Sequence, residues 1–212
     1  MLTTLVLAAF AYALGSLSGS LLVGRLRRTD IREHGSGNAG GTNALRILGW
    51  RLALAVVVID IAKGALASGL ALRLAPAEGP LSPEALGYLA GLLAVIGHCW
   101  PIWHGFRGGK GGATLVGALL AFWPLALVPM LATWFLVLGI RGFVGLATIA
   151  AAWVLPAFAA WQGATAGLAF GLAAAALITF THRGNLSRMV SGTEPCFERA
   201  RVLRLFRRGP IE

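Results

Sequence analysis

The sequence has few charged residues. Only 12% of its 212 residues are Asp, Glu, Lys or Arg, whereas 57% are apolar and the mean hydropathy is +0.76. So little charge cannot cover the surface of a soluble domain, and the composition therefore predicts an integral membrane protein. The apolar segment 2–24 has no basic residues before it and no cleavage site followed by a soluble domain, so we expect a retained membrane span rather than a signal peptide.

Cysteines and several common catalytic motifs are also scarce or missing. Cys99 and Cys196 lie far apart, without the spacing of a zinc site or a CxxC motif, so we expect reduced thiols and no metal centre. The chain has no GxSxG, no HExxH and no His followed five residues later by Asp. These absences argue against a serine hydrolase, a zinc protease and the soluble-faced His-x4-Asp acyltransferases.

Acidic residues are fewer than basic ones, and the position of the basic residues is informative. The chain has 18 Lys and Arg against 8 Asp and Glu, a net charge of +10, and 16 of the basic residues lie beside apolar runs. This distribution follows the positive-inside rule and predicts cytoplasmic loops that contact anionic lipid headgroups. A nucleic-acid surface would need basic residues interleaved with exposed aromatics on a soluble face, so we expect no nucleic-acid partner.

The apolar runs predict seven helices, with a break at Trp123-Pro124. One continuous span over 112–140 would put Arg141 and the basic C-terminal segment on the outside of the membrane. Two short helices that enter the membrane and return to the same side keep these basic residues on the cytoplasmic side, as the positive-inside rule requires. The prediction is an all-α polytopic integral membrane protein, one membrane domain over 1–212, with the N-terminus outside and the C-terminus cytoplasmic. The expected helices are 2–24, 52–72, 84–100, 112–123, 124–140, 143–160 and 164–181.

Asp60 and Lys63 interrupt the second apolar run. They are three residues apart and therefore share a helix face. Ionisable groups at this depth are costly and usually face the bundle interior. We expect an internal ion pair that fixes helix packing, and the alternative is a link to a substrate site.

Three polar islands, at about 25–50, 97–114 and 182–198, lie at the ends of apolar runs. The first contains the segment His34–Arg46, whose four glycines, two hydroxyls, two amides and arginine can direct many donors at one anion. In the second, Gly108-Gly109-Lys110-Gly111 precedes a helix, where backbone N–H groups and a lysine can hold a phosphate. Gly111 stands where a Walker A motif needs Ser or Thr, so nucleotide chemistry is not expected. The alternative for this island is a flexible turn with a lysine near lipid headgroups.

The third island contains His182 and Asn185. Three residues apart on a continuing helix, they can reach one bound group, and a histidine can act as a base or as a donor to phosphate. The alternative is that His182 and Arg183 stabilise the carbonyl end of the preceding helix.

Together these motifs resemble a known family. They are Ser36-Gly37-Asn38-x-Gly40-x-Thr42-Asn43-x-x-Arg46, Asp60-x-x-Lys63-Gly64, Gly97-His98-x-x-Pro101 with Gly108-Gly109-Lys110-Gly111-x-Ala113-Thr114, and His182-x-x-Asn185 with Gly192-x-Glu194. The chain is similar, from about residue 15 to 198, to the bacterial acyl-phosphate:glycerol-3-phosphate acyltransferases of the PlsY family. The resemblance implies an enzyme of the bacterial inner membrane, with its active site facing the cytoplasm, that moves a fatty acyl group from acyl phosphate to the 1-hydroxyl of glycerol 3-phosphate. Its products would be lysophosphatidate and phosphate, and it would use no metal or other cofactor.

The motifs and the resemblance give three sets of expected residues. The catalytic set is Ser36, Arg46, Lys110, His182 and Asn185. The substrate- and phosphate-binding set is Gly37, Asn38, Gly40, Thr42, Asn43, Gly108, Gly109, Gly111, Thr114 and Thr148. The structural set is Asp60, Lys63 and Glu194. The expected partners are acyl phosphate, glycerol 3-phosphate, membrane lipids and the enzyme that makes acyl phosphate from acyl carrier protein.

Two questions of mechanism and class stay open at this point. Acyl phosphate is an activated mixed anhydride, so positioning and charge neutralisation suffice without an acyl-enzyme, and the proton of the attacking hydroxyl goes to the donor's phosphate or to His182. The competing class is a transporter of organic phosphate or another small anion. Transporters place their sites at the midplane between repeats, whereas no repeat is visible here.

Overall fold

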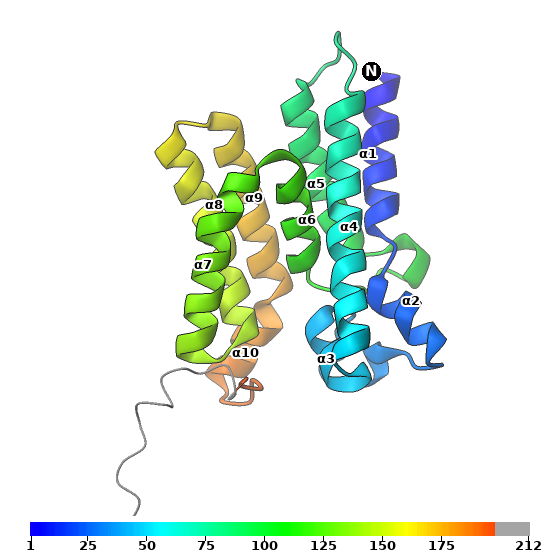
Figure 1. Cartoon of the computed structure of the whole chain (residues 1–212), viewed down its shortest axis with the longest axis vertical. Coiled ribbons are helices and arrows are strands. Elements are labelled where there is room, and N and C mark those ends of the chain that lie inside the picture. Colours follow the sequence, from blue (N-terminus) through cyan, green and yellow to red (C-terminus); the bar gives the residue numbers. More distant parts are fainter. Residues whose placement is uncertain (198–212) are drawn as a thin grey trace, which may run out of the picture. The chain divides into compact units, whose positions relative to one another are not determined.

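The computed structural model describes residues 1–197, and the regular structure in this range is helical (Figure 1). This confirms the predicted all-α class. Residues 198–212 lie outside the described range, and they include five of the arginines that support the predicted cytoplasmic C-terminus. The helices are α1 (Leu2–Gly15), α2 (Gly19–Leu26), η1 (Ile31–Glu33), α3 (Gly41–Leu48), α4 (Trp50–Leu74), α5 (Pro83–Cys99), η2 (Ile102–His104), α6 (Gly112–Phe122), α7 (Pro124–Arg141), α8 (Val144–Gln162), α9 (Thr165–Thr181) and α10 (Arg183–Val190).

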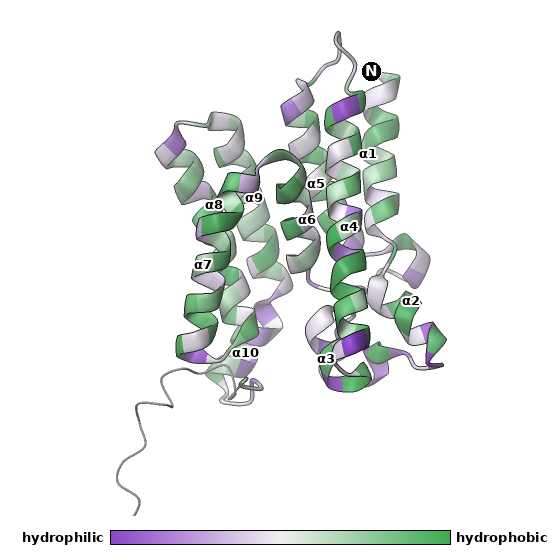
Figure 2. Cartoon of the chain, in the orientation of Figure 1, coloured by the Kyte–Doolittle hydropathy of each residue, from purple (hydrophilic) through white to green (hydrophobic). Residues whose placement is uncertain are grey.

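The apolar helices match the seven predicted segments in order. Within the described residues, α4, α5, α7 and α8 are each long and apolar enough to cross a membrane. Two further spans result if the bent pairs α1 with α2 and α9 with α10, at 41° and 53°, each count as one. Figure 2 shows the hydrophobic residues along these helices and the hydrophilic ones gathered near helix ends and loops. The chain is a multi-pass membrane protein.

The predicted break at Trp123-Pro124 is confirmed. Proline has no N–H to continue a helix but fits the first position of a new one, and Pro124 begins α7. α6 has 11 residues and a length of about 16 Å, which is too short for a hydrocarbon core of about 30 Å. α7, predicted as a second short helix, has 18 residues and is long and apolar enough to span.

Two other boundaries differ from the prediction. The first span, expected to be continuous, breaks between α1 and α2 at residues 16–18. The first polar island, expected to be a loop through Arg46, turns helical at Gly41 because Ala44 and the apolar residues after it pack α3 against α4. Thr42, Asn43 and Arg46 therefore lie on a helix.

The described chain forms two compact units, Met1–Leu127 and a second that begins at Val128. In the first unit, α4 packs against α1, α5 and α6, and α1 packs against α5. Glycines allow these close approaches: a methyl group on Gly64 of α4 would collide with the Thr114 carbonyl of α6, and one on Gly97 of α5 with the Tyr12 carbonyl of α1. In the second unit, α8 pairs with α9, and α10 contacts both.

Two glycines on α4 give a test of this packing. Gly64→Ala is expected to lower the free energy of unfolding by roughly 1–3 kcal/mol, because the new methyl must displace the backbone of α6. Gly69→Ala is the control, since its methyl would meet only the Ala121 methyl at 3.8 Å and should leave stability unchanged or slightly raised. Thermal unfolding midpoints in detergent measure both, and equal midpoints would contradict the packing argument.

Candidate active site

A buried ion pair joins the two halves of the broken first span. Lys63 Nζ lies 3.0 Å from Asp60 Oδ1, and both side chains are nearly inaccessible to solvent, so the expected internal pair is present. Lys63 also donates to the Leu17 carbonyl at 2.7 Å, while Asp60 Oδ1 accepts from the Gly19 N–H at 3.3 Å. Leu17 lies within the break between α1 and α2, and Gly19 is the first residue of α2. The pair therefore satisfies a carbonyl and an N–H that the break removes from the helical ladder.

The same lysine orients His98, at the end of α5. Lys63 Nζ lies 2.8 Å from His98 Nδ1. An ammonium has three N–H donors, and Asp60, Leu17 and His98 supply three acceptors. His98 Nδ1 also lies 3.5 Å from Asp60 Oδ1, so the ion pair holds this ring nitrogen from two sides. A methyl group on Gly109 would collide with His98 Nε2, so the imidazole edge lies directly against the second polar island.

The second island folds back onto the end of α5. Gly108 N–H donates to the Cys99 carbonyl at 3.1 Å, and Gly109 N–H donates to the His98 carbonyl at 3.0 Å. A side chain on Gly108 would collide with that His98 carbonyl, so this approach requires glycine. Lys110 follows, half-buried, and Gly111 (φ +89°) caps the N-terminus of α6. The loop thus places a lysine beside a helix N-terminus, as the sequence predicts for a phosphate site.

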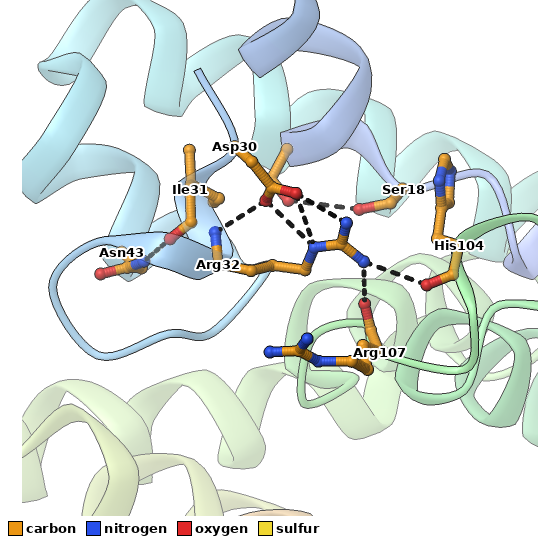
Figure 3. A network of polar contacts seen from close by, with 8 residues as sticks. Ser18, Asp30, Ile31, Arg32, Asn43, His104 and Arg107 are labelled. Carbon is orange, nitrogen blue, oxygen red and sulfur yellow. Dashed lines mark hydrogen bonds and ion pairs between the residues drawn. The ribbon is translucent and has the colours of Figure 1, made fainter.

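The first and second islands meet within the first unit. Ala39 N–H donates to the Gly108 carbonyl at 3.4 Å, and Arg32 Nη1 donates to the carbonyls of His104 at 3.0 Å and Arg107 at 3.3 Å. Arg32 is itself held by Asp30, with Nη2 2.6 Å from Oδ2 (Figure 3). The hydrogen bonds from Arg32 hold the pKa of the Asp30 carboxyl below its ordinary value, so the pair is ionised at neutral pH.

Asn43 shapes the turn that carries Ser36. Its buried side chain donates from Nδ2 to the carbonyls of Ile31 and His34, at 2.9 and 3.1 Å, and accepts at Oδ1 from the Ser36 N–H at 3.0 Å. Ser36 itself is exposed, and Gly35 and Gly37 beside it both have positive φ. Asn43, predicted to bind phosphate, thus has its amide engaged by the loop backbone, which points to a positioning role.

The third island belongs to the second unit. His182 is buried at the junction of α9 and α10, with Nδ1 2.8 Å from the Ile178 carbonyl. A carbonyl can only accept, so Nδ1 carries the proton and the neutral ring has its lone pair on Nε2. Glu194 accepts from Asn185 Nδ2 through one oxygen and from Arg188 Nε, at 2.8 Å, through the other. Glu194 therefore orients Asn185, in keeping with its predicted structural role.

Comparison with known proteins identifies the family. A family model described as glycerol-3-phosphate acyltransferase matches residues 5–192. The chain belongs to this family. A glycerol-3-phosphate acyltransferase of Gloeobacter violaceus is 44% identical over 88% of the chain and 91% of the relative, and one of Chlorobium luteolum is 37% identical over 92% and 96%.

Solved structures agree with this assignment. The crystal structure of PlsY, an integral membrane glycerol 3-phosphate acyltransferase, in its glycerol 3-phosphate form, is 30% identical, covers 97% of this chain and 99% of that one, and has a TM-score of 0.84. Its lysophosphatidic acid form is 31% identical, covers 95% and 98%, and has a TM-score of 0.83. The chain is an acyltransferase of the PlsY family, which decides against the transporter alternative.

Two threonines predicted as phosphate contacts in this acyltransferase have other surroundings. Thr114 is fully buried in α6, and its hydroxyl has no hydrogen-bond partner among the described residues. The Thr148 hydroxyl accepts from Trp134 Nε1 at 3.2 Å and donates to the Val144 carbonyl at 2.8 Å. The protein partners of the Thr148 hydroxyl are therefore known, whereas the Thr114 hydroxyl has none in this range, and the phosphate contact of each threonine stays a prediction.

Sequence reasoning gave no role to His98, Asp30 or Arg32. His98 was visible as part of the Gly97-His98-x-x-Pro101 motif, a titratable residue at the very end of an apolar run. Arg32 was counted only as a basic residue next to the membrane, and Asp30 was not singled out. Asp30 and Arg32 are two residues apart, but the contacts of Arg32 with the second island and of Lys63 with His98 join residues distant in sequence, so those contacts left no local signal.

Removing the buried ammonium tests its part in the acyltransferase fold. Lys63→Met leaves the Asp60 carboxylate and the Leu17 carbonyl unsatisfied, so we expect the free energy of unfolding to fall by about 3–5 kcal/mol. Arg73→Met, an exposed position on the same helix, should change it by less than about 0.5 kcal/mol. Adding Asp60→Leu to Lys63→Met should recover part of the loss, because no buried charge is then unpaired. Thermal unfolding of the four proteins would disprove the pairing if Lys63→Met matched the control.

Proposed function

We propose that this acyltransferase moves a fatty acyl group from acyl phosphate to the 1-hydroxyl of sn-glycerol 3-phosphate, and releases lysophosphatidate and inorganic phosphate. The observation that carries the proposal is the junction of two glycine-bearing islands at Ala39 and Gly108, which brings the first loop to the segment that contains Lys110. Both substrates carry phosphate groups, and such loops are suited to hold them. The PlsY structures named for their glycerol 3-phosphate and lysophosphatidic acid forms support the same acceptor and product.

The binding roles follow from charge and exposure. Lys110 and Arg46 neutralise the phosphoryl charges, and the N-terminus of α6 adds its orphan N–H groups beside Lys110. The exposed Ser36 contributes its hydroxyl, with Asn43 fixing the loop behind it. The remaining donors come from a set of loop residues in the two islands: Gly37, Asn38, Gly40, Thr42, Gly108, Gly109 and Gly111.

The chemical step needs no acyl-enzyme. The 1-hydroxyl oxygen attacks the acyl carbonyl, a new ester bond forms, and the bond from the acyl carbon to the phosphate oxygen breaks. The hydroxyl proton passes to the leaving phosphate, whose negative charge grows as that bond breaks. His182 Nε2, the lone-pair nitrogen of the neutral ring, accepts a hydrogen bond from the glycerol 3-phosphate hydroxyl, and Asn185 binds a phosphate oxygen beside it.

The enzyme is proposed to lie in the bacterial inner membrane with its site facing the cytoplasm. The basic residues of the described islands support this orientation through the positive-inside rule. The N-terminus is then outside. Acyl phosphate would reach the site from the enzyme that makes it from acyl carrier protein, and no cofactor takes part.

The reaction can be tested with purified protein in detergent. With synthetic acyl phosphate, inorganic phosphate and lysophosphatidate should appear in equal amounts, and only when glycerol 3-phosphate is added. Lys110→Ala should lower kcat/KM by about a hundredfold or more, because a cation at developing phosphate charge is lost. The exposed Arg73→Ala should behave like the unmodified protein. Phosphate release that does not depend on glycerol 3-phosphate would refute the proposal.

His182→Gln separates a hydrogen-bonding role from a general-base role. Glutamine retains a polar group near Nε2 but cannot take a proton at neutral pH, so kcat should fall by less than about tenfold if the leaving phosphate takes the proton. His182→Ala should raise KM for glycerol 3-phosphate. A loss of about a hundredfold or more in kcat for His182→Gln, with unchanged KM, would instead make His182 the base.

A further inference from the structure

The turn before the glycine-rich loop holds an unusual backbone conformation. Gly105 and Phe106 both have positive φ, +63° and +59°. For a residue with a Cβ this left-handed conformation is energetically unfavourable, and for a bulky residue it is rare. Such a conformation persists only where the surrounding structure holds it. The turn ends at Arg107, directly before Gly108 and Gly109, so its shape sets where the Lys110 loop begins.

Arg32 bridges this turn from outside. Its Nη1 donates to the carbonyl of His104 at 3.0 Å and to the carbonyl of Arg107 at 3.3 Å, the two residues that flank Gly105 and Phe106 (Figure 3). Inside the turn, the Pro101 carbonyl accepts from the N–H groups of His104 and Phe106, at 3.1 and 3.0 Å. One guanidinium nitrogen therefore ties together the two ends of the left-handed pair.

Asp30 fixes the direction of this guanidinium. Arg32 Nε donates to both carboxylate oxygens, at 3.0 and 3.1 Å, and Nη2 donates to Oδ2 at 2.6 Å. The carboxylate also accepts from the Arg32 backbone N–H at 2.9 Å, so it caps η1 at the same time. Because Nε and Nη2 of the planar guanidinium are bound to Asp30, the remaining nitrogen, Nη1, points at the turn. A lysine has no fork and cannot make both sets of bonds.

We propose that Arg32 is a positioning residue for the acyl transfer: oriented by Asp30, its guanidinium holds the left-handed turn at Gly105–Phe106 and thereby sets the position of the loop Gly108–Lys110. The inference rests on the proposed phosphate-binding role of Lys110. The contact between the first and second islands then has a function, because Arg32 of the first island determines the backbone conformation of the second.

Enzyme kinetics of the full-length protein give the first test. Arg32→Ala and Arg32→Lys should each lower kcat/KM at least tenfold, since two hydrogen bonds from a charged group are lost or misdirected. Arg27→Ala, an exposed arginine of the same basic segment, should stay within twofold of the unmodified enzyme. An Arg32→Ala enzyme within twofold of the unmodified one would overturn the proposal.

A rescue experiment separates this role from general support of the fold. Phe106→Gly removes the cost of the left-handed conformation, so the double variant Arg32→Ala/Phe106→Gly should regain at least fivefold in kcat/KM over Arg32→Ala. Phe106→Ala also removes the ring but keeps a Cβ, and so should restore nothing. Equal rescue by glycine and alanine, or rescue by neither, would contradict the proposal.

Hydrogen exchange supplies a readout that does not depend on activity. In substrate-free protein, Arg32→Ala should speed exchange of the Gly108 and Gly109 amides, which bond to the end of α5, and Phe106→Gly should slow it again. If the unmodified enzyme fails to use acyl phosphate but these exchange rates change as expected, the proposed function is wrong, whereas the conclusion that Arg32 sets the position of the loop Gly108–Lys110 stands. Unchanged exchange in Arg32→Ala, with an active unmodified enzyme, refutes the positioning role alone.

Discussion

The first unit depends on one buried ammonium group. A span that breaks inside a membrane leaves carbonyl and N–H groups without water to satisfy them. Lys63 and Asp60 supply the missing partners at Leu17 and Gly19, and the third bond of the lysine fixes the ring of His98. His98 in turn lies against Gly109. A charge pair that looks like internal packing thus supports both the broken helix and the backbone from which Lys110 extends.

The polar groups around the two joined islands divide into two kinds. Backbone groups and exposed side chains such as Ser36 are the proposed ligand contacts, whereas Asn43 and Arg32 donate to loop carbonyls and Asp30 holds the Arg32 guanidinium. Glu194 does the equivalent for Asn185 in the second unit. Glycines let the loops approach neighbouring backbone so closely that side chains would collide. Rigid placement of donors before substrate arrives is what the proposed direct acyl transfer needs.

Local chemistry made much of this architecture predictable. Apolar runs gave the order of the spans, and Pro124 gave the break before α7 because proline cannot continue a helix. The break after α1 has no proline, and its stabilisation comes from α4, 41 and 46 residues away in sequence. The bonds from Arg32 to the second island cross 72 and 75 residues. The surroundings of Thr114 and Thr148 were likewise decided by packing that a motif does not encode.

The bridge from Arg32 reaches only main-chain oxygens of His104 and Arg107. Every amino acid has the same backbone carbonyl, so the two hydrogen bonds from Arg32 do not depend on which side chains these residues carry. The side chains at positions 104 and 107 can therefore vary in evolution without a change in the loop geometry. The exposed Arg107 is for the same reason a convenient attachment point for a spectroscopic reporter close to the loop that carries Lys110.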